Sequence, residues 1–249
     1  MLDRRLARDL SGAACGTFPV RWDTMKSVKR SPVVTPGFPR NTLDSEGLPV
    51  WIRDLASEDP NHSLHVVRDM GPVRALEALR VEPASIQQCV LPDQKPNRYT
   101  SLPSAALGGD TGDAATLLAG RIGQWTFVYD DLGYTVDGAA EVLSRGGRTA
   151  VTTVYTINGH ASLHYAVDGE EIEEVVIDEL SLEERLPGMS TELVAAFEAA
   201  GIADWEDLEP GEVDSLIGMR VACAMAGAVL TLDDIRRMHL VMGQRNAGD

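Results

Sequence analysis

The chain has 249 residues, of which 44% are hydrophobic and 24% charged. These proportions exclude a collagen, a coiled coil and a wholly disordered chain, and the length allows one large domain or two small ones. It carries 22 basic and 38 acidic side chains, a net charge of −16, so the folded body lacks the positive surface that nucleic-acid binding requires.

The first fifty residues differ in charge and composition from the rest. Residues 1–40 contain eight basic and three acidic side chains, and prolines interrupt every apolar run up to residue 50. We therefore expect residues 1–50 to be a basic, proline-rich, poorly ordered extension, followed by a single α+β domain over residues 51–249. The extension could contact a nucleic acid, lie on the acidic body or remain a solvated tail. An upstream start codon, with Met25 as the natural initiator, is a further alternative.

From residue 51 the pattern is typical of a globular domain. Pro72 fits the first turn of a helix over 73–80, and residues 81–112 are rich in loop signals. Asp113 is an N-cap candidate for a short helix, Ala114–Ala119.

Strand signals dominate the middle of the chain, around a short helix expected at Ala139–Ser144. Asp168-Gly169 is a strong hairpin signal, and a two-residue turn there would place His164 opposite Glu173. We expect an antiparallel β-meander of about five strands packed against helices: Trp125–Tyr129, Tyr134–Val136, Thr149–Asn158, His160–Val167 and Glu170–Ile177.

The last third of the chain is predicted to be helical. Ser181 and Thr231 each begin a capping-box pattern, and further helices are expected at 192–200, about 212–229 and 235–242. Gly243 is the expected C-cap of the last helix. The residues from Ala222 to Gly227 are nearly all small, which permits close approach of a neighbouring segment.

Cysteine usage and hydropathy favour a cytoplasmic location. Cys15, Cys89 and Cys223 are far apart and odd in number, so neither a disulfide framework nor a zinc ribbon is expected. The longest apolar run, Val221–Leu230, is about half the roughly 20 residues of a membrane helix. We expect no membrane partner; the oligomeric state stays open.

Acidic residues concentrate in one segment, which motivates our main functional hypothesis. Residues 168–214 contain seventeen acidic side chains and a single basic one, Arg185. Such a cluster steers basic proteins toward itself. The hypothesis is a non-enzymatic interaction module with a basic protein partner, in a defence or toxin-neutralising role, through a surface formed by Glu170, Glu171, Glu173 and Glu174.

A glycine-rich turn suggests an alternative, a small-anion receptor or an enzyme. Arg145, Gly146, Gly147 and Arg148 could bind an anion through backbone amides and guanidinium groups. Trp125, Asn158 and His160 are the residues expected to line such a pocket.

Common catalytic and metal-binding signatures are absent from the sequence. No G-x-S-x-G, H-E-x-x-H or G-x-G-x-x-G motif occurs, so we predict no catalytic residue, metal or cofactor. Adjacent acid pairs such as Asp130-Asp131 are predicted to be solvated.

Several motifs in the middle of the chain follow one another in a recognisable order: GQWTFV at 123–128, Asp131-x-Gly133-Tyr134, LSRGGR at 143–148 and the turn at 165–169. In that order they resemble an uncharacterised domain-of-unknown-function family of actinomycetes. The resemblance covers about residues 60–240. It implies similar domain boundaries and an actinobacterial source. The family has no assigned activity, so the resemblance implies no mechanism.

Overall fold

The computed structural model describes residues 36–39, 41–58, 61–109, 114–156, 158, 160–177, 189–201 and 214–246. All described residues belong to one compact unit, residues 32–249.

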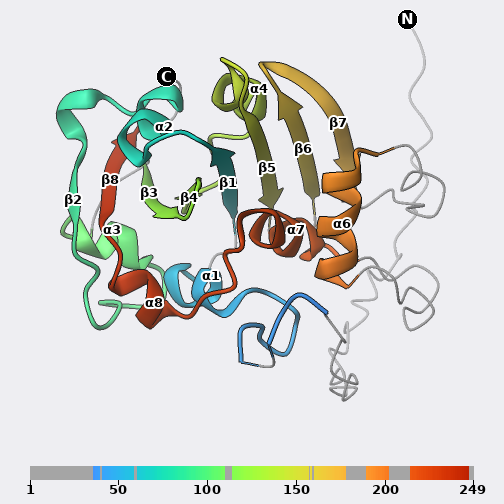
Figure 1. Ribbon diagram of the computed structural model, residues 1–249. Helices are drawn as coiled ribbons and strands as arrows, with labels where there is room; N and C mark the ends of the chain where they lie inside the picture. Colours follow the sequence, from blue (N-terminus) through green and yellow to red (C-terminus); the bar gives the residue numbers. More distant parts are fainter. Residues whose placement is uncertain are drawn as a thin grey trace, which may run out of the picture. The chain divides into compact units, whose positions relative to one another are not determined.

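An eight-stranded antiparallel sheet organises this unit, in the order β2-β8-β3-β4-β1-β5-β6-β7 (Figure 1). The predicted α+β fold with an antiparallel sheet is confirmed, although the sheet has more strands than the expected five. The strands are β1 (His62–Arg68), β2 (Gln87–Cys89), β3 (Ala115–Ile122), β4 (Trp125–Asp130), β5 (Thr149–Tyr155), β6 (Ala161–Val167), β7 (Glu170–Val176) and β8 (Leu240–Arg245).

Helices cover both faces of the sheet (Figure 1). On one face α7 packs on β1 and β5 and against α6, and α1 packs with α8 over the same core, whereas α2 and α4 cover the opposite face. The helices are α1 (Val50–Leu55), α2 (Pro72–Ala78), the 3₁₀ turn η1 (Pro83–Ser85), α3 (Leu102–Ala106), α4 (Ala139–Ser144), α6 (Thr191–Ala200), α7 (Ile217–Ala226) and α8 (Leu232–Arg236). None of the helices in the described part of the chain has both the length and the apolarity of a membrane span.

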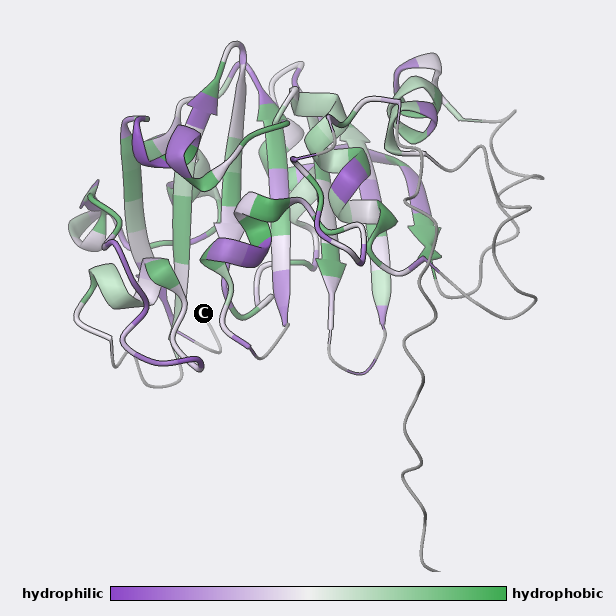
Figure 2. Cartoon of the chain, turned by 90° about the horizontal axis from the view of Figure 1, so that it is seen from below, coloured by the Kyte–Doolittle hydropathy of each residue, from purple (hydrophilic) through white to green (hydrophobic). Residues whose placement is uncertain are grey.

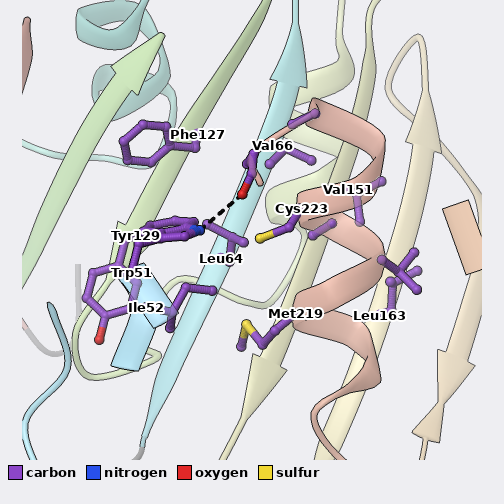
Figure 3. Close-up of a cluster of buried hydrophobic side chains, with 14 of the residues drawn as sticks. Trp51, Ile52, Leu64, Val66, Phe127, Tyr129, Val151, Leu163, Met219 and Cys223 are labelled. Atoms are coloured by element: carbon purple, nitrogen blue, oxygen red, sulfur yellow. Dashed lines mark hydrogen bonds between the residues drawn. The ribbon is translucent and has the colours of Figure 1, made fainter. Parts of the chain in front are cut away.

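The larger hydrophobic core lies between the sheet and α7 (Figure 3). Trp51, Phe127 and Tyr129 are fully buried there, and the Trp51 and Phe127 rings meet edge to face at 5.3 Å between centroids. The Trp51 indole N–H donates to the Ala228 carbonyl at 3.2 Å, which satisfies its polar atom. Hydrophobic residues lie along the strands and along the helices that cover them (Figure 2).

Two segments predicted as helices are strands. Residues 115–119 of the first segment belong to β3. Residues 235–242 contain the end of α8 and the start of β8, so the C-terminal third ends in a strand. Both strands lie inside the sheet. Residues 115–120 of β3 are all buried, so the alternation that identifies a strand is missing there. Gly243 is likewise no helix cap. It lies in β8, and a Cβ there would be 2.4 Å from Val81 Cγ1.

Other predicted elements are present where the local signals are strong. The helices at 73–80, 139–144 and 192–200 correspond to α2, α4 and α6, and Gly201 ends α6 with a φ of 88°. Thr231 and Asp234 form the expected capping box. The predicted strand Tyr134–Val136 is irregular instead, and the capping box at Ser181 lies outside the described residues.

Part of the predicted N-terminal extension packs against the domain. Phe38 is buried in the larger core, the Gly37 N–H donates to the Ala199 carbonyl at 3.0 Å, and α1 begins at Val50. Residues 1–35 and 40 lie outside the described residues.

A buried arginine connects this segment to the helices. Arg220 of α7 is 1% exposed and donates to the carbonyls of Gly47, at 3.0 Å, and Ala200, at 2.9 Å. It also forms an ion pair with Asp214. Arginine suits this position because its guanidinium carries five donors in a planar fork.

Candidate functional site

The four glutamates predicted as an interaction surface lie on β7, an edge strand of the sheet. β7 pairs with β6 and with no other strand of the described sheet. We call this set the acidic edge: Glu170, Glu171 and Glu174, which are exposed, and Glu173, which is half-buried. The rest of the acidic segment, at 178–188 and 202–213, lies outside the described residues.

The hairpin that begins β7 has the predicted two-residue turn but a different register. Asp168 and Gly169 have φ of 52° and 86°, as a type I′ turn requires, and Val167 opposes Glu170. A β-bulge then shifts the register, so His164 faces Glu174 and the predicted pairing with Glu173 is wrong. Bulges of this kind are common at sheet edges.

The bulge brings His164 to a different glutamate. His164 Nδ1 lies 2.8 Å from Glu171 Oε2, and its Nε2 lies 3.2 Å from Ser162 Oγ. The bulge also leaves Ile172 outside the pairing, with 51% of its surface exposed. The acidic edge therefore has an apolar side chain at its centre.

The predicted anion-binding turn already holds a carboxylate of this chain. Gly146 and Gly147 have φ of 80° and 76°, a conformation that glycine adopts without strain. The Gly147 N–H donates to Asp168 Oδ1 at 2.6 Å. The anion bound by this turn is thus the carboxylate of Asp168, a residue of the β6–β7 hairpin turn.

The two arginines of the turn do not converge on a site. Arg148 Nε donates to the Asp69 carbonyl at 3.3 Å, and its Nη1 donates to the Arg145 carbonyl. Arg145 is exposed. The guanidinium of Arg148 therefore bonds to backbone oxygens of neighbouring loops.

Further hydrogen bonds join this turn to the β6–β7 hairpin. The Asp168 N–H donates to the Arg148 carbonyl at 2.9 Å, and the Gly169 N–H donates to Ser144 Oγ at 2.9 Å. With the bond from Gly147 to Asp168, three hydrogen bonds connect the two turns. We call these three bonds the turn clamp, and they hold the first residue of the acidic edge in place.

The residues predicted to complete an anion pocket lie apart. Trp125 begins β4 at the Arg148 end of the sheet, where it is 5% exposed and the Arg68 guanidinium lies 4.6 Å from its ring centroid. Asn158 and His160 are exposed in the connection from β5 to β6. The seven residues of β5 separate the two ends by about 20 Å at ~3.3 Å per residue, so the structure does not bring these side chains together.

A buried polar cluster at the end of β4 is the main feature that the sequence analysis missed. Asp131, predicted to be solvated, is 4% exposed and accepts hydrogen bonds from Ser101 Oγ, Ser104 Oγ and the Thr116 N–H. Desolvation by burial raises the pKa of Asp131 to about 6, despite these bonds. The serines and threonines spaced through 101–116 were the only signal in the sequence.

Asp130 lies on the opposite face of the sheet and is also fully buried. Its carboxylate accepts the N–H groups of Leu132 and Gly133 at 3.0 Å, and the N–H and hydroxyl of Thr135 at 2.9 and 2.7 Å. Burial raises the pKa of Asp130 and these bonds oppose the rise. They also hold residues 132–135 out of a strand.

The hydrogen bonds around Asp130 determine which ring nitrogen of His65 carries the proton. His65 Nε2 lies 2.7 Å from Thr135 Oγ1, and its Nδ1 lies 3.0 Å from Thr152 Oγ1. Because Thr135 donates its hydroxyl proton to Asp130, its oxygen accepts from Nε2–H, and Nδ1 then accepts from Thr152. Burial, and the charge of Arg245, lower the pKa of His65 to about 3, so this histidine is neutral near pH 7.

A second histidine of β1, His62, is buried beside Tyr129, with 6.0 Å between the two ring centroids. Among the residues that the structure describes, neither ring nitrogen of His62 has a hydrogen-bond partner, and neither does the Tyr129 hydroxyl. Burial lowers the pKa of His62 to about 4. Unpaired buried polar atoms cost stability. Because both pKa values lie well below 6.5, we expect His62 and His65 each to make the stability of the fold sensitive to acid.

The described residues offer no metal centre. Within those ranges, no three His, Cys, Asp or Glu side chains could hold a metal ion. Cys89 and Cys223 are buried free thiols, and burial raises the pKa of Cys89 to about 11 and that of Cys223 further. Cys15 lies outside the described residues.

No family model matches the chain, and no curated protein or solved structure matches it either. The geometry of the site is therefore the basis for any proposal about function.

Proposed function

We propose that this protein is a non-enzymatic interaction module that presents the acidic edge to a basic protein partner. The observation that carries the proposal is the location of the four glutamates on an edge strand, with three of them exposed. Clustered charge on an accessible surface raises the rate of association with an oppositely charged protein and favours it over others.

The geometry gives less support to the alternative of a small-anion receptor. The Gly147 amide is occupied by Asp168, and Arg148 bonds to two carbonyls. An external anion would have to displace a carboxylate held within the same turn clamp. We therefore favour the acidic edge over the turn as the binding surface.

Charge reversal on the acidic edge tests this function. The variant carries lysine at Glu170, Glu171, Glu173 and Glu174, and a control carries lysine at the exposed acids Glu46, Glu77, Glu82 and Asp93. The two variants have the same net charge and differ only in where the charge is changed. The tagged proteins are used to capture partners from lysate of the host organism over a series of salt concentrations.

We expect the wild type and the control to retain a basic protein that salt elutes, because screening weakens exposed charge contacts. The edge variant should lose that protein. Retention of the same proteins by the edge variant would contradict the proposal.

A further inference from the structure

We infer that the basic partner binds as an added β-strand along the outer edge of β7, an inference that rests on the proposed function. An edge strand presents a row of N–H and C=O groups without a partner strand. Addition of an extended segment to such an edge is a general mode of peptide recognition, in which backbone bonds give affinity and side chains give specificity.

The hairpin geometry identifies backbone groups that are available to a partner. In a two-residue hairpin the residues flanking the turn, here Val167 and Glu170, exchange both backbone bonds. The N–H and C=O of the next residue, Glu171, therefore point away from β6. They face the side on which the described sheet has no further strand.

The register places the glutamates on both faces of β7. Glu173 pairs with Tyr165, which belongs to the core beneath α7, so Glu173 is on that face. Glu174 follows it on the face of α4. Glu170 and Glu171 divide in the same way, because they pair with Val167 and Ala166 respectively.

This distribution specifies the sequence of the partner strand. Neighbouring residues of a strand point to opposite faces, so carboxylates on both faces are matched by consecutive basic residues. Ile172, exposed between the two glutamate pairs, matches an apolar residue. The partner segment therefore has one apolar residue, with one pair of Lys or Arg residues before it and another pair after it.

The turn clamp prepares this edge for binding. It fixes Asp168 and Gly169 to the preceding turn through hydrogen bonds of 2.6 to 2.9 Å. A preformed edge loses little conformational entropy when a strand is added, which favours affinity. A second copy of this chain is a poor occupant, since pairing β7 with itself would set glutamate against glutamate.

A peptide with the matching pattern provides the first test. The probe is a fluorescent Thr-Arg-Lys-Val-Arg-Lys-Thr peptide, and two further versions carry N-methyl groups on odd or on even residues. N-methylation removes hydrogen-bond donors from one edge of the peptide and leaves its charge unchanged. We expect the parent and one methylated version to bind, and the other to bind at least ten-fold more weakly.

A pair of protein variants provides the second test. Glu171→Pro and Glu171→Gln both lose the carboxylate, but only proline also removes the outward N–H, and proline is tolerated on edge strands. We expect the peptide to bind Glu171→Pro at least ten-fold more weakly than Glu171→Gln. If Glu171→Pro does not fold, as judged by circular dichroism, the methylated peptides alone decide.

The outcomes separate this inference from the proposed function. Salt-sensitive binding that is lost in the four-lysine edge variant, yet is indifferent to N-methylation and to proline, would overturn the added strand and leave the acidic interaction surface standing. Failure of every peptide to bind, while the wild type retains a basic protein that the edge variant loses, would overturn the added strand alone. Retention of the same proteins by the edge variant would contradict the proposed function. A dimer that depends on the acidic edge, seen by sedimentation, would also overturn the inference.

Discussion

Two pairs of consecutive acidic residues show how burial gives carboxylates different roles. Asp130 and Asp131 are enclosed and accept seven hydrogen bonds from within the chain, whereas Glu170 and Glu171 are exposed on an edge strand. The first pair organises a loop and a helix, and the second is available to a partner. Charge density along the sequence does not distinguish them.

The buried His62 gives a test at the scale of one residue. Its pKa is about 4 in the folded protein against 6.5 for the free side chain. Between those values the unfolded chain binds a proton that the folded protein does not, so the stability due to His62 is complete above pH 6.5 and is lost as the pH falls toward 4. Between pH 7 and pH 5 the loss amounts to about 2 kcal/mol.

Substitution by leucine should remove this dependence. Between pH 7 and pH 5, the free energy of unfolding, measured with urea, should fall by about 2 kcal/mol less in His62→Leu than in the wild type. At pH 7 the variant should be at least as stable, because two unpaired nitrogens are removed. Equal pH dependence of the two proteins would show that His62 is protonated in the folded state.

At the scale of elements, the position of α7 depends on small residues. Gly218, Ala222 and Ala226 recur every four residues and are all buried. A Cβ on Gly218 would lie 2.2 Å from Thr153 Oγ1 and 2.9 Å from Ile177 Cδ1, so the helix backbone packs directly on β5. Close contact between α7 and the sheet therefore requires glycine at this position.

Replacing that glycine should loosen the packing of α7. We expect Gly218→Ala to lose about 1–3 kcal/mol of unfolding free energy, as overpacked cores do. Adding Thr153→Ala should restore part of the loss, because it removes the closest atom. Gly71→Ala is the control, since a Cβ there meets nothing within 4 Å. Equal effects of Gly218→Ala and Gly71→Ala in thermal unfolding would contradict this account.

These elements also show how far the sequence could predict the structure. The 165–170 turn, the helix end at Gly201 and the capping box at Thr231 were predictable because each depends on neighbouring residues. β8 was not, because it pairs with β2 and β3, which are distant in the sequence. β3 was not, because residues 115–120 are all buried and so lack the alternation of a strand. The acidic edge was predictable from composition, but its position on an edge strand, the bulge and the turn clamp depend on tertiary contacts.

At the scale of the whole molecule, the sheet is completed by its last strand. β8 lies between β2 and β3, and its pairs with β3 join Ala115 to Arg245 and Ala119 to Val241. Such long-range pairing forms slowly. We expect a chain ending at His239 to lose cooperative unfolding in urea, because β2 then has no neighbour and β3 has only one.

A chain ending at Asn246 serves as the control for this truncation. It retains β8 and should unfold at the same urea concentration as the full chain. Cooperative unfolding of the chain ending at His239, with an unchanged dependence on urea, would show that β8 only adds to a sheet that is already stable.

The order of the strands also has a consequence during protein synthesis. The hairpins of β5, β6 and β7 are contiguous in the sequence and can form as they leave the ribosome, with the glutamates already at their edge. β3, which carries the buried Leu117 and Leu118, has to wait for residues 240–245. Until then the side of β3 that faces away from β4 is an unpaired apolar edge, the kind of surface on which nascent chains aggregate. A chain released before residues 240–245 are made would therefore keep this apolar edge exposed.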